Sequence, residues 1–358
     1  MDNNEIIHLR LWNQLISKPR FNTPLEVVSW LGAIQAQNYA SAKWSIGARN
    51  PEINDADVEQ AIVDKTIIRT WMMRSTLHFV AKADIRWMLE LLTPQLIARS
   101  ALRYRQLELD EPTFKKSKEV FFSELMVAKQ LTRHDMMSAL EKAKISTSGQ
   151  RGYHLLARAA KDGLICFGPQ QGKEQTFVLL DEWAPDAKHM KRSLALSELA
   201  LRYFTSYGPA TLKDFVWWSG LKVSDAKQGL NAVSYRLKSE EVNGKIYWMA
   251  SYDEDNQKNF SKIHLLPGYD EYLLGYKDRG AVVDKQDAAK ISPGNNGVFN
   301  PTIVVNGRVA GIWKSGLKKD VLSITSHPFV PFTELEKGAF IKAAEKYGKF
   351  LEKSVIIN

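Results

Sequence analysis

A signal for the start of a helix occurs three times in the sequence, and this repetition constrains the fold more than any other feature. In each copy a threonine stands three residues before a carboxylate, and an apolar helical stripe follows; the copies begin at Thr23, Thr132 and Thr211. The threonine hydroxyl can accept a hydrogen bond from the third helical amide, while the carboxylate favours the positive end of the helix. One copy arises easily by chance, whereas three copies in matching surroundings indicate a repeated structural unit.

The surroundings of the three copies match. An amphipathic helix is expected before each copy, a further helical stretch after it, and then two strand-like runs joined by turn residues. In the third set the runs meet at Asn243-Gly244, a dipeptide typical of two-residue hairpin turns. Three helices followed by a two-stranded hairpin are the plan of a winged helix, whose third helix enters a DNA groove. The same plan also serves as a scaffold for protein contacts, so the topology leaves both uses open.

The pattern changes after about residue 256, where short apolar runs alternate with glycine, proline and asparagine. Such runs predict an all-β unit, a small barrel or curled sheet, followed by a closing helix from Glu334 to Tyr347. The sequence therefore predicts an α+β fold of three tandem winged-helix units followed by a C-terminal β-barrel-like domain. The expected domains are residues 1–110 (the first winged helix with a helical extension at 84–106), 111–190 (the second), 191–255 (the third) and 256–358 (the β-rich domain).

The composition favours an anionic partner. The chain has 49 Lys and Arg against 40 Asp and Glu, which gives a formal net charge of +9 and a pI near 9.3, and a basic surface concentrates polyanions, above all nucleic acid. The single cysteine, Cys166, excludes an internal disulfide and a thiolate zinc site. The first residues lack the pattern of a signal peptide, and no apolar run approaches the roughly 20 residues of a membrane span. We therefore expect a cytoplasmic protein.

The usual signatures of catalysis are absent from the sequence. There is no Walker loop and no zinc-protease motif, and the seven histidines lack ligand spacing, so neither a cofactor nor a metal is expected. The motif that stands out is Gln35-Ala36-Gln37, between the first capped helix and the helix after it. Side chains two residues apart diverge by about 200° on a helix but share a side of an extended chain. The two amides therefore converge only if the preceding helix ends near Gln35; otherwise they decorate a polar surface, which spacing alone favours.

Longer segments resemble a known family. They are Leu31–Gln37, Arg69–His78, Gly208–Phe215, Leu265–Arg279 and Asn306–Lys314. Through them the chain resembles, over nearly its whole length, the bacterial winged-helix family that includes the AlkZ-type DNA glycosylases. The resemblance implies three tandem winged helices with a terminal β-barrel, and it implies that Gln35 and Gln37 are the catalytic pair. Asn38 stands where many relatives have aspartate, and Ser75 replaces a frequent glycine.

The function implied by this resemblance is that of a DNA glycosylase, a hydrolase of N-glycosidic bonds. Its substrates would be N-alkylated bases of the N7-alkylguanine type, with interstrand crosslinks through guanine N7 as an extension. Alkylation at N7 places a positive charge on guanine, so the base leaves without a general acid, and a neutral amide can orient the water that attacks the sugar C1′. The expected partner is double-stranded DNA carrying alkylated purines, the expected state is a monomer, and no membrane partner is expected.

Two alternatives remain at this point. A non-enzymatic winged-helix DNA-binding protein or regulator would use the same units, although a regulator normally dimerises to read two half-sites. A scaffold for protein contacts is the second alternative.

Basic side chains along the expected hairpins are candidate DNA contacts. Arg69, Arg74 and His78 are expected to face the same groove as the glutamines, with Arg74 near the wing tip, where a phosphate contact is reasonable. Trp71 is interpreted as a core residue, and His78 is equally a hydrogen-bonded core histidine. Arg308 and Lys314 flank the later hairpin, and for them the alternative to a phosphate contact is a solvated face of that hairpin. The complete set of expected DNA contacts is Arg69, Arg74, His78, Lys43, Arg308 and Lys314.

Overall fold

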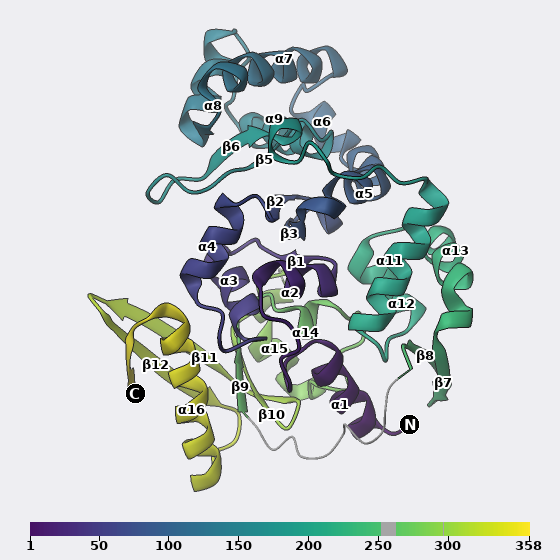
Figure 1. Cartoon of the computed structure of the whole chain (residues 1–358), viewed down its shortest axis with the longest axis vertical. Helices are drawn as coiled ribbons and strands as arrows, with labels where there is room; N and C mark the ends of the chain where they lie inside the picture. Colours follow the sequence, from purple (N-terminus) through teal and green to yellow (C-terminus); the bar gives the residue numbers. More distant parts are fainter. Residues whose placement is uncertain (252–262, 296) are drawn as a thin grey trace. The chain divides into compact units, whose positions relative to one another are not determined.

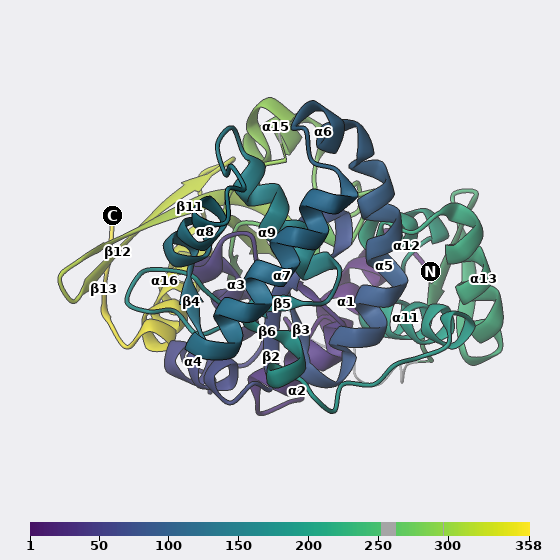
Figure 2. The same ribbon diagram turned by 90° about the horizontal axis from the view of Figure 1, so that it is seen from above.

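The computed structural model describes residues 1–251, 263–295 and 297–358. The backbone forms two compact units: the first comprises residues 1–58 and 196–358, and the second comprises residues 59–195. Figure 1 follows the chain through both units, and Figure 2 shows the same ribbon turned by 90°.

The first unit combines helices from both ends of the sequence with two sheets. Its amino-terminal elements are α1 (Asn3–Asn13), α2 (Pro24–Leu31), β1 (Ile34–Gln35) and α3 (Tyr39–Gly47). Its later elements are α12 (Leu212–Ser219), α13 (Val223–Val233), β7 (Lys238–Val242), β8 (Lys245–Met249), β9 (Ile263–Leu266), α14 (Glu271–Leu274), α15 (Ala288–Ile291), β10 (Thr302–Val305), β11 (Arg308–Lys318), β12 (Val321–Pro328), α16 (Glu334–Leu351) and β13 (Ser354–Ile357).

The second unit contains the middle of the sequence. The chain passes between the units within α4 (Asp55–Val63) and α11 (Arg192–Ser206). The elements between them are β2 (Ile67–Trp71), β3 (Leu77–Ala81), α5 (Ile85–Arg99), α6 (Ala101–Gln106), α7 (Glu111–Ala128), β4 (Leu131–Thr132), α8 (Arg133–Lys142), α9 (Arg151–Lys161), β5 (Ile165–Phe167), β6 (Thr176–Leu179) and α10 (Leu180–Trp183).

The three predicted helix starts are confirmed. Thr23, Thr132 and Thr211 cap α2, α8 and α12, each accepting a hydrogen bond from the amide three residues on, whose own carboxylate accepts one from the threonine amide. Each box thus satisfies two backbone N–H groups near the start of its helix that have no partner within it. The start of these helices is therefore encoded locally.

The order of elements around each box also follows the prediction. The three sets are α1–α2–α3 with β2–β3, α7–α8–α9 with β5–β6, and α11–α12–α13 with β7–β8, and each hairpin is antiparallel. Asn243 and Gly244 have positive φ angles of 51° and 73°, as a two-residue hairpin turn requires. The helical extension is present as α5 and α6. Helix α4 was not predicted, because its nine residues give an apolar stripe of little more than two turns.

The C-terminal residues form a curled five-stranded sheet in the order β13-β12-β11-β10-β9. Strands β9 to β12 are antiparallel, β13 joins parallel to β12, and a bulge between Ile303 and Val304 adds to the bend of β10. The predicted barrel-like domain is thus a curled sheet with β9 and β13 as its outer strands. Helix α16 packs against both of these strands (Figure 1). It begins at the predicted Glu334 and extends past the predicted end at Tyr347.

The first unit has a core shared by distant segments. Ile7 and Leu11 of α1 belong to the same buried cluster as Tyr272 of α14 and Val304 of β10. Because burial of apolar area is the main stabilising contribution, the amino-terminal helix folds together with the C-terminal sheet.

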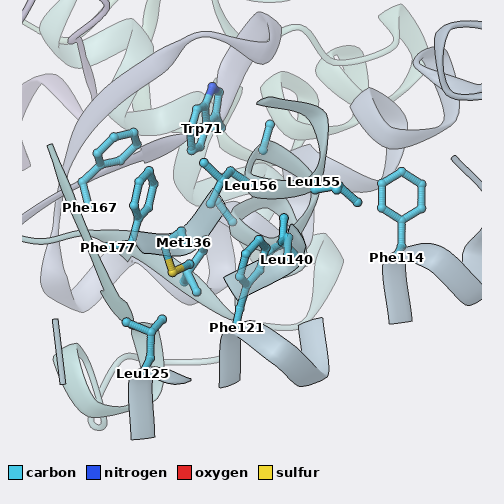
Figure 3. Close-up of a cluster of buried hydrophobic side chains, with 14 of the residues drawn as sticks. Trp71, Phe114, Phe121, Leu125, Met136, Leu140, Leu155, Leu156, Phe167 and Phe177 are labelled. Carbon is cyan, nitrogen blue, oxygen red and sulfur yellow. The ribbon is translucent and has the colours of Figure 1, made fainter. Parts of the chain in front are cut away.

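The two hairpins of the second unit join into one antiparallel sheet, in which the strands follow the order β3-β2-β5-β6-β4. Helix α9 packs against β2 and β5, and α7 packs against β6 (Figure 2). Figure 3 shows the aromatic core beneath these helices. The ring of Trp71 lies 4.9 Å from that of Phe167 and 5.8 Å from that of Tyr153. The interpretation of Trp71 as a core residue is therefore confirmed.

Candidate active site

The two glutamines lie on an extended segment between α2 and α3. Helix α2 ends where Gly32 adopts a φ of 75°, which glycine tolerates because it has no Cβ. The chain is then extended as far as Gln35, and α3 begins after Asn38, whose side chain accepts a hydrogen bond from the Ser41 amide at 3.0 Å. We call residues 32–37 the strap. The condition that the helix must end before the glutamines is met.

The two amides have different environments. Gln35 is buried, with 8% of its surface exposed, whereas Gln37 is exposed. One amide is therefore enclosed by its surroundings, while the other is open to solvent. Convergence of the two amides on one water molecule stays a prediction.

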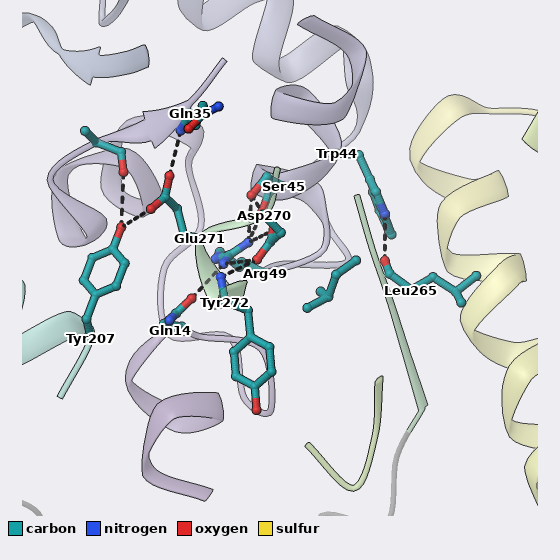
Figure 4. A network of polar contacts seen from close by, with 12 residues as sticks. Gln14, Gln35, Trp44, Ser45, Arg49, Tyr207, Leu265, Asp270, Glu271 and Tyr272 are labelled. Atoms are coloured by element: carbon teal, nitrogen blue, oxygen red, sulfur yellow. Dashed lines mark hydrogen bonds and ion pairs between the residues drawn. The ribbon is translucent and has the colours of Figure 1, made fainter. Parts of the chain in front are cut away.

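A buried carboxylate holds the strap from beneath. The Gln35 backbone amide donates to Oε1 of Glu271 at 2.8 Å, and the side chains of Tyr207 and Trp218 donate to Oε2 at 3.1 Å each. Figure 4 shows Gln35 and Tyr207 meeting at this carboxylate. Glu271, Tyr207 and Trp218 are fully buried. Burial, reinforced by the Glu271 charge, raises the pKa of Tyr207 well above its ordinary value, so its hydroxyl remains a donor.

The residue before Glu271 forms a second buried ionic site. The Arg49 guanidinium donates to both oxygens of Asp270, at 2.8 and 3.0 Å, and the Ser45 hydroxyl donates at 2.6 Å. Burial disfavours both charges, yet the Arg49 guanidinium holds the pKa of Asp270 below its usual value, and Asp270 raises the pKa of Arg49. Asp270 therefore acts as a structural anion that fixes the start of α14, and the same turn carries Glu271 (Figure 4).

The second unit carries three of the predicted site residues. In the β2–β3 pairing, Thr70 lies opposite His78 and Arg69 lies opposite Phe79. Directly paired residues share a face of a sheet, and neighbours along a strand point to opposite faces. Arg69 and His78 therefore point to opposite faces, and the expectation that they face one groove is wrong. The Arg69 guanidinium instead covers the ring of Phe167 at 4.9 Å.

His78 is a buried neutral histidine. Its Nδ1 lies 3.1 Å from the Thr76 carbonyl oxygen and so carries the proton. Burial and the Arg74 charge lower the pKa of His78 to about 3. Within the part of the chain that the structure describes, Nε2 of His78 and the hydroxyl of Thr70 across from it are buried and have no hydrogen-bond partner. This face of the hairpin therefore holds a buried acceptor, His78 Nε2, and a buried hydroxyl, that of Thr70.

The other predicted contacts have separate positions. Arg74 lies in the β2–β3 turn with a φ of 54°, near the tip as predicted. Lys43 is buried and pairs with Asp55 at 2.7 Å. Arg308 donates to the Ala281 carbonyl oxygen at 3.0 Å and pairs with Asp284, whereas Lys314 is exposed on β11. Lys314 is therefore more available to a phosphate than Lys43 or Arg308, because a cation that already pairs with a carboxylate offers a phosphate less charge.

A basic groove of about 840 Å³, which was not predicted, lies in the first unit. It is lined by α12, α13, the β7–β8 hairpin and the segment after α14. Leu230, Ile246 and Trp248 give it an apolar lining. Asp278, the only carboxylate among the described residues that line it, pairs with Lys245. The lining cations are Lys213, Lys227, Lys245, Lys277 and Arg279. The segment Gly208–Phe215 contains Lys213, and the segment Leu265–Arg279 contains Lys277 and Arg279. Because both segments carry the family resemblance, their basic residues could have indicated the groove.

Comparison with known protein families gives the class of this protein. A family model described as "DNA glycosylase AlkZ-like" matches residues 28–350, so the chain belongs to the AlkZ-like DNA glycosylase family. The expectation of an enzyme of the DNA glycosylase class is thereby confirmed. Among the residues that the structure describes, no helix combines the length and the apolar character needed to cross a bilayer.

Two proteins from Streptomyces sahachiroi are similar to this chain, one by sequence and one by structure. An interstrand DNA cross-link repair glycosylase from Streptomyces sahachiroi is 25% identical over 362 residues, which cover 96% of this chain and 93% of the relative. The solved structure of the Streptomyces sahachiroi DNA glycosylase AlkZ has a TM-score of 0.80 at 21% identity and covers 100% of both chains. The structural match shows that the fold is shared along the whole length.

Proposed function

We propose that this enzyme excises N-alkylated purines of the N7-alkylguanine type from double-stranded DNA, with Gln35 and Gln37 as the catalytic pair. The observation that carries the proposal is the strap of an AlkZ-like glycosylase, with one glutamine fixed by burial and the other exposed. We also assign the three sets of helices with hairpins as winged helices, which is supported by their element order and capped starts.

The chemistry suits neutral amides. The bond between C1′ and N9 breaks, its electron pair neutralises the charge of the N7-alkylated base, and a water oxygen bonds to C1′ and releases a proton to solvent. An amide oxygen accepts a hydrogen bond from that water, and an amide NH₂ can donate one to it, so the pair holds the water in line without an ionisable base. An exposed Gln37 suits bulky adducts, because it needs no deep pocket. Opening of interstrand crosslinks is the extension supported by the name of the Streptomyces relative.

The proposed DNA contacts differ in kind. Arg74 and Lys314 would contact phosphates. His78 is buried, so its expected contact with DNA stays a prediction. Lys43 and Arg308 pair with carboxylates, and Arg69 packs on a ring, so their expected role in DNA binding stays a prediction.

The release of a damaged base tests the function directly. Duplex DNA with a single N7-methylguanine is incubated with the enzyme, and abasic sites are measured by cleavage at elevated pH. We expect release from the methylated duplex and none from the undamaged one, because neutral guanine is a poor leaving group. Duplexes with a bulky N7 adduct and with an N7-linked interstrand crosslink extend the series. Binding without release from any of these substrates would contradict the enzyme function and favour a DNA-binding protein.

The basic groove should contribute to binding of the phosphate backbone. Exchange of the exposed Lys213 and Lys277 for glutamate should weaken binding of undamaged duplex by about tenfold or more at low salt. It should also reduce the slope of log affinity against log salt by about two, because each lost phosphate contact releases about one counterion fewer. The control with the same charge change is Lys115→Glu with Lys116→Glu on α7, where both lysines are exposed. Equal slopes for the two double variants would exclude the groove as a DNA contact.

A further inference from the structure

Glu271 is a buried residue whose carboxylate contacts the strap. It is 0% exposed, and its carboxylate accepts hydrogen bonds from the Gln35 amide, the Tyr207 hydroxyl and the Trp218 indole. Removal of a carboxylate from water is costly, and each of these hydrogen bonds offsets part of that cost. Two of the donors are side chains of other segments, and the third is the main chain of the strap itself.

The carboxylate connects the strap to three separate segments. Glu271 begins α14, which the Asp270–Arg49 pair holds in place. Tyr207 follows α11, and its hydroxyl also lies 3.3 Å from the Ala33 carbonyl oxygen. Trp218 of α12 lies beneath the start of the strap, where its ring would be 3.6 Å from a Cβ at Gly32. The backbone of the strap is thus held at Gly32, Ala33 and Gln35 by buried side chains.

We propose that Glu271 is a positioning residue that fixes the Gln35 backbone and thereby the direction of the Gln35 amide. This inference rests on the proposed function, in which that amide holds the attacking water. A carboxylate oxygen accepts more strongly than a neutral amide or a carbonyl group, so it holds a main-chain N–H at a defined point. Reacting groups lose about 100-fold in rate when displaced by about 1 Å. Glu271 therefore acts on the reaction through Gln35 and does not touch the DNA.

Two substitutions separate this role from a general role in folding. In Glu271→Ala the strap loses its acceptor, and the single-turnover rate of N7-methylguanine release should fall by about 100-fold, with the affinity for undamaged duplex unchanged. In Glu271→Gln the amide oxygen can still accept from Gln35, although its NH₂ then opposes the donors Tyr207 and Trp218. The single-turnover rate of Glu271→Gln should therefore be at least tenfold higher than that of Glu271→Ala.

A matched control lies in the same buried network. The Tyr276 hydroxyl donates to the Tyr207 carbonyl oxygen at 2.8 Å and accepts from Gln14 at 2.9 Å, away from the strap. Tyr276→Phe should lower the melting temperature without changing the rate of release at a temperature well below melting. The inference is overturned if Glu271→Ala keeps a rate within threefold of the wild type, or if Tyr276→Phe loses as much rate as Glu271→Ala.

A readout without substrate tests the contact between Glu271 and the strap separately from the proposed function. Hydrogen exchange of the Gln35 amide, followed by NMR, should accelerate by at least tenfold in Glu271→Ala and much less in Glu271→Gln and Tyr276→Phe. If the wild type releases no base but this pattern holds, the proposed function fails while Glu271 is shown to hold the strap. If the wild type releases the base and the exchange of Gln35 is unchanged in Glu271→Ala, the proposed function stands and the positioning role is excluded.

Discussion

Gln37→Ala should lower the single-turnover release of N7-methylguanine by about 100-fold or more while the affinity for undamaged duplex stays the same. The expected loss follows from the chemistry, because a charged leaving group needs little help and the remaining barrier depends on an oriented water. Gln37 is exposed, so its loss leaves no buried cavity and should not change the melting temperature. The measurement is the release assay with enzyme in excess over DNA.

Gln35→Ala should have a similar effect on the rate. Since both amides are proposed to hold one water molecule, the double variant should be little slower than either single variant, as expected for groups that act as a unit. Gln60→Ala is the control, because Gln60 is an exposed glutamine on α4 whose side chain bonds only locally to Asp64 at 2.7 Å. Wild-type rates in both single variants would contradict the catalytic assignment, and multiplied losses in the double variant would contradict a shared water.

The features that could be predicted from the sequence are those encoded by neighbouring residues. A capping box spans four residues, and the hairpin turn consists of the adjacent residues Asn243 and Gly244, both with positive φ angles. These local signals gave the helix starts, the hairpins and the order of elements. The closing helix α16 begins with another box of this kind, formed by Thr333 and Glu336, which the structure reveals.

The support of the candidate site could not be predicted because it depends on distant contacts. Gln35 and Glu271 are 236 positions apart, and Asp270 and Glu271 look like a solvated acidic pair in the sequence. Both are buried in the structure. The Asp270 carboxylate can stay charged in the core because it pairs with Arg49, which is 221 positions away in the sequence.

The error concerning Arg69 and His78 has a different origin. Alternation along each strand was recognised correctly, but the face that two strands share depends on their register, which the turn determines. In this hairpin the turn extends from Met72 to Thr76, and it places Thr70 rather than Arg69 opposite His78. A period-two pattern therefore identifies which residues of one strand share a face of the sheet. It does not determine which residues of the partner strand lie on that same face.

Asp270→Asn should lower the free energy of unfolding by about 3 to 5 kcal/mol, the usual result when one partner of a buried ion pair is removed. The substitution keeps the shape of the side chain but leaves the Arg49 guanidinium, which is 1% exposed, without its anion. The double variant Arg49→Met with Asp270→Asn should be less destabilised than Asp270→Asn alone, because the uncompensated charge is then absent. Urea unfolding followed by tryptophan fluorescence measures all three proteins.

The pH dependence of the same experiment gives an independent check. The pKa of Asp270 is lowered in the folded chain relative to about 3.9 in the unfolded one. A carboxylate with a lowered folded-state pKa contributes stability that is fully present above the unfolded-state value and is lost as the pH falls toward the folded-state value. The difference in stability between the wild type and Asp270→Asn should therefore be constant from pH 8 to about pH 5 and should narrow below about pH 4. A difference that instead narrows between pH 8 and 6 would show that another group titrates in this network, and the assignment of Asp270 as its permanent anion would be wrong.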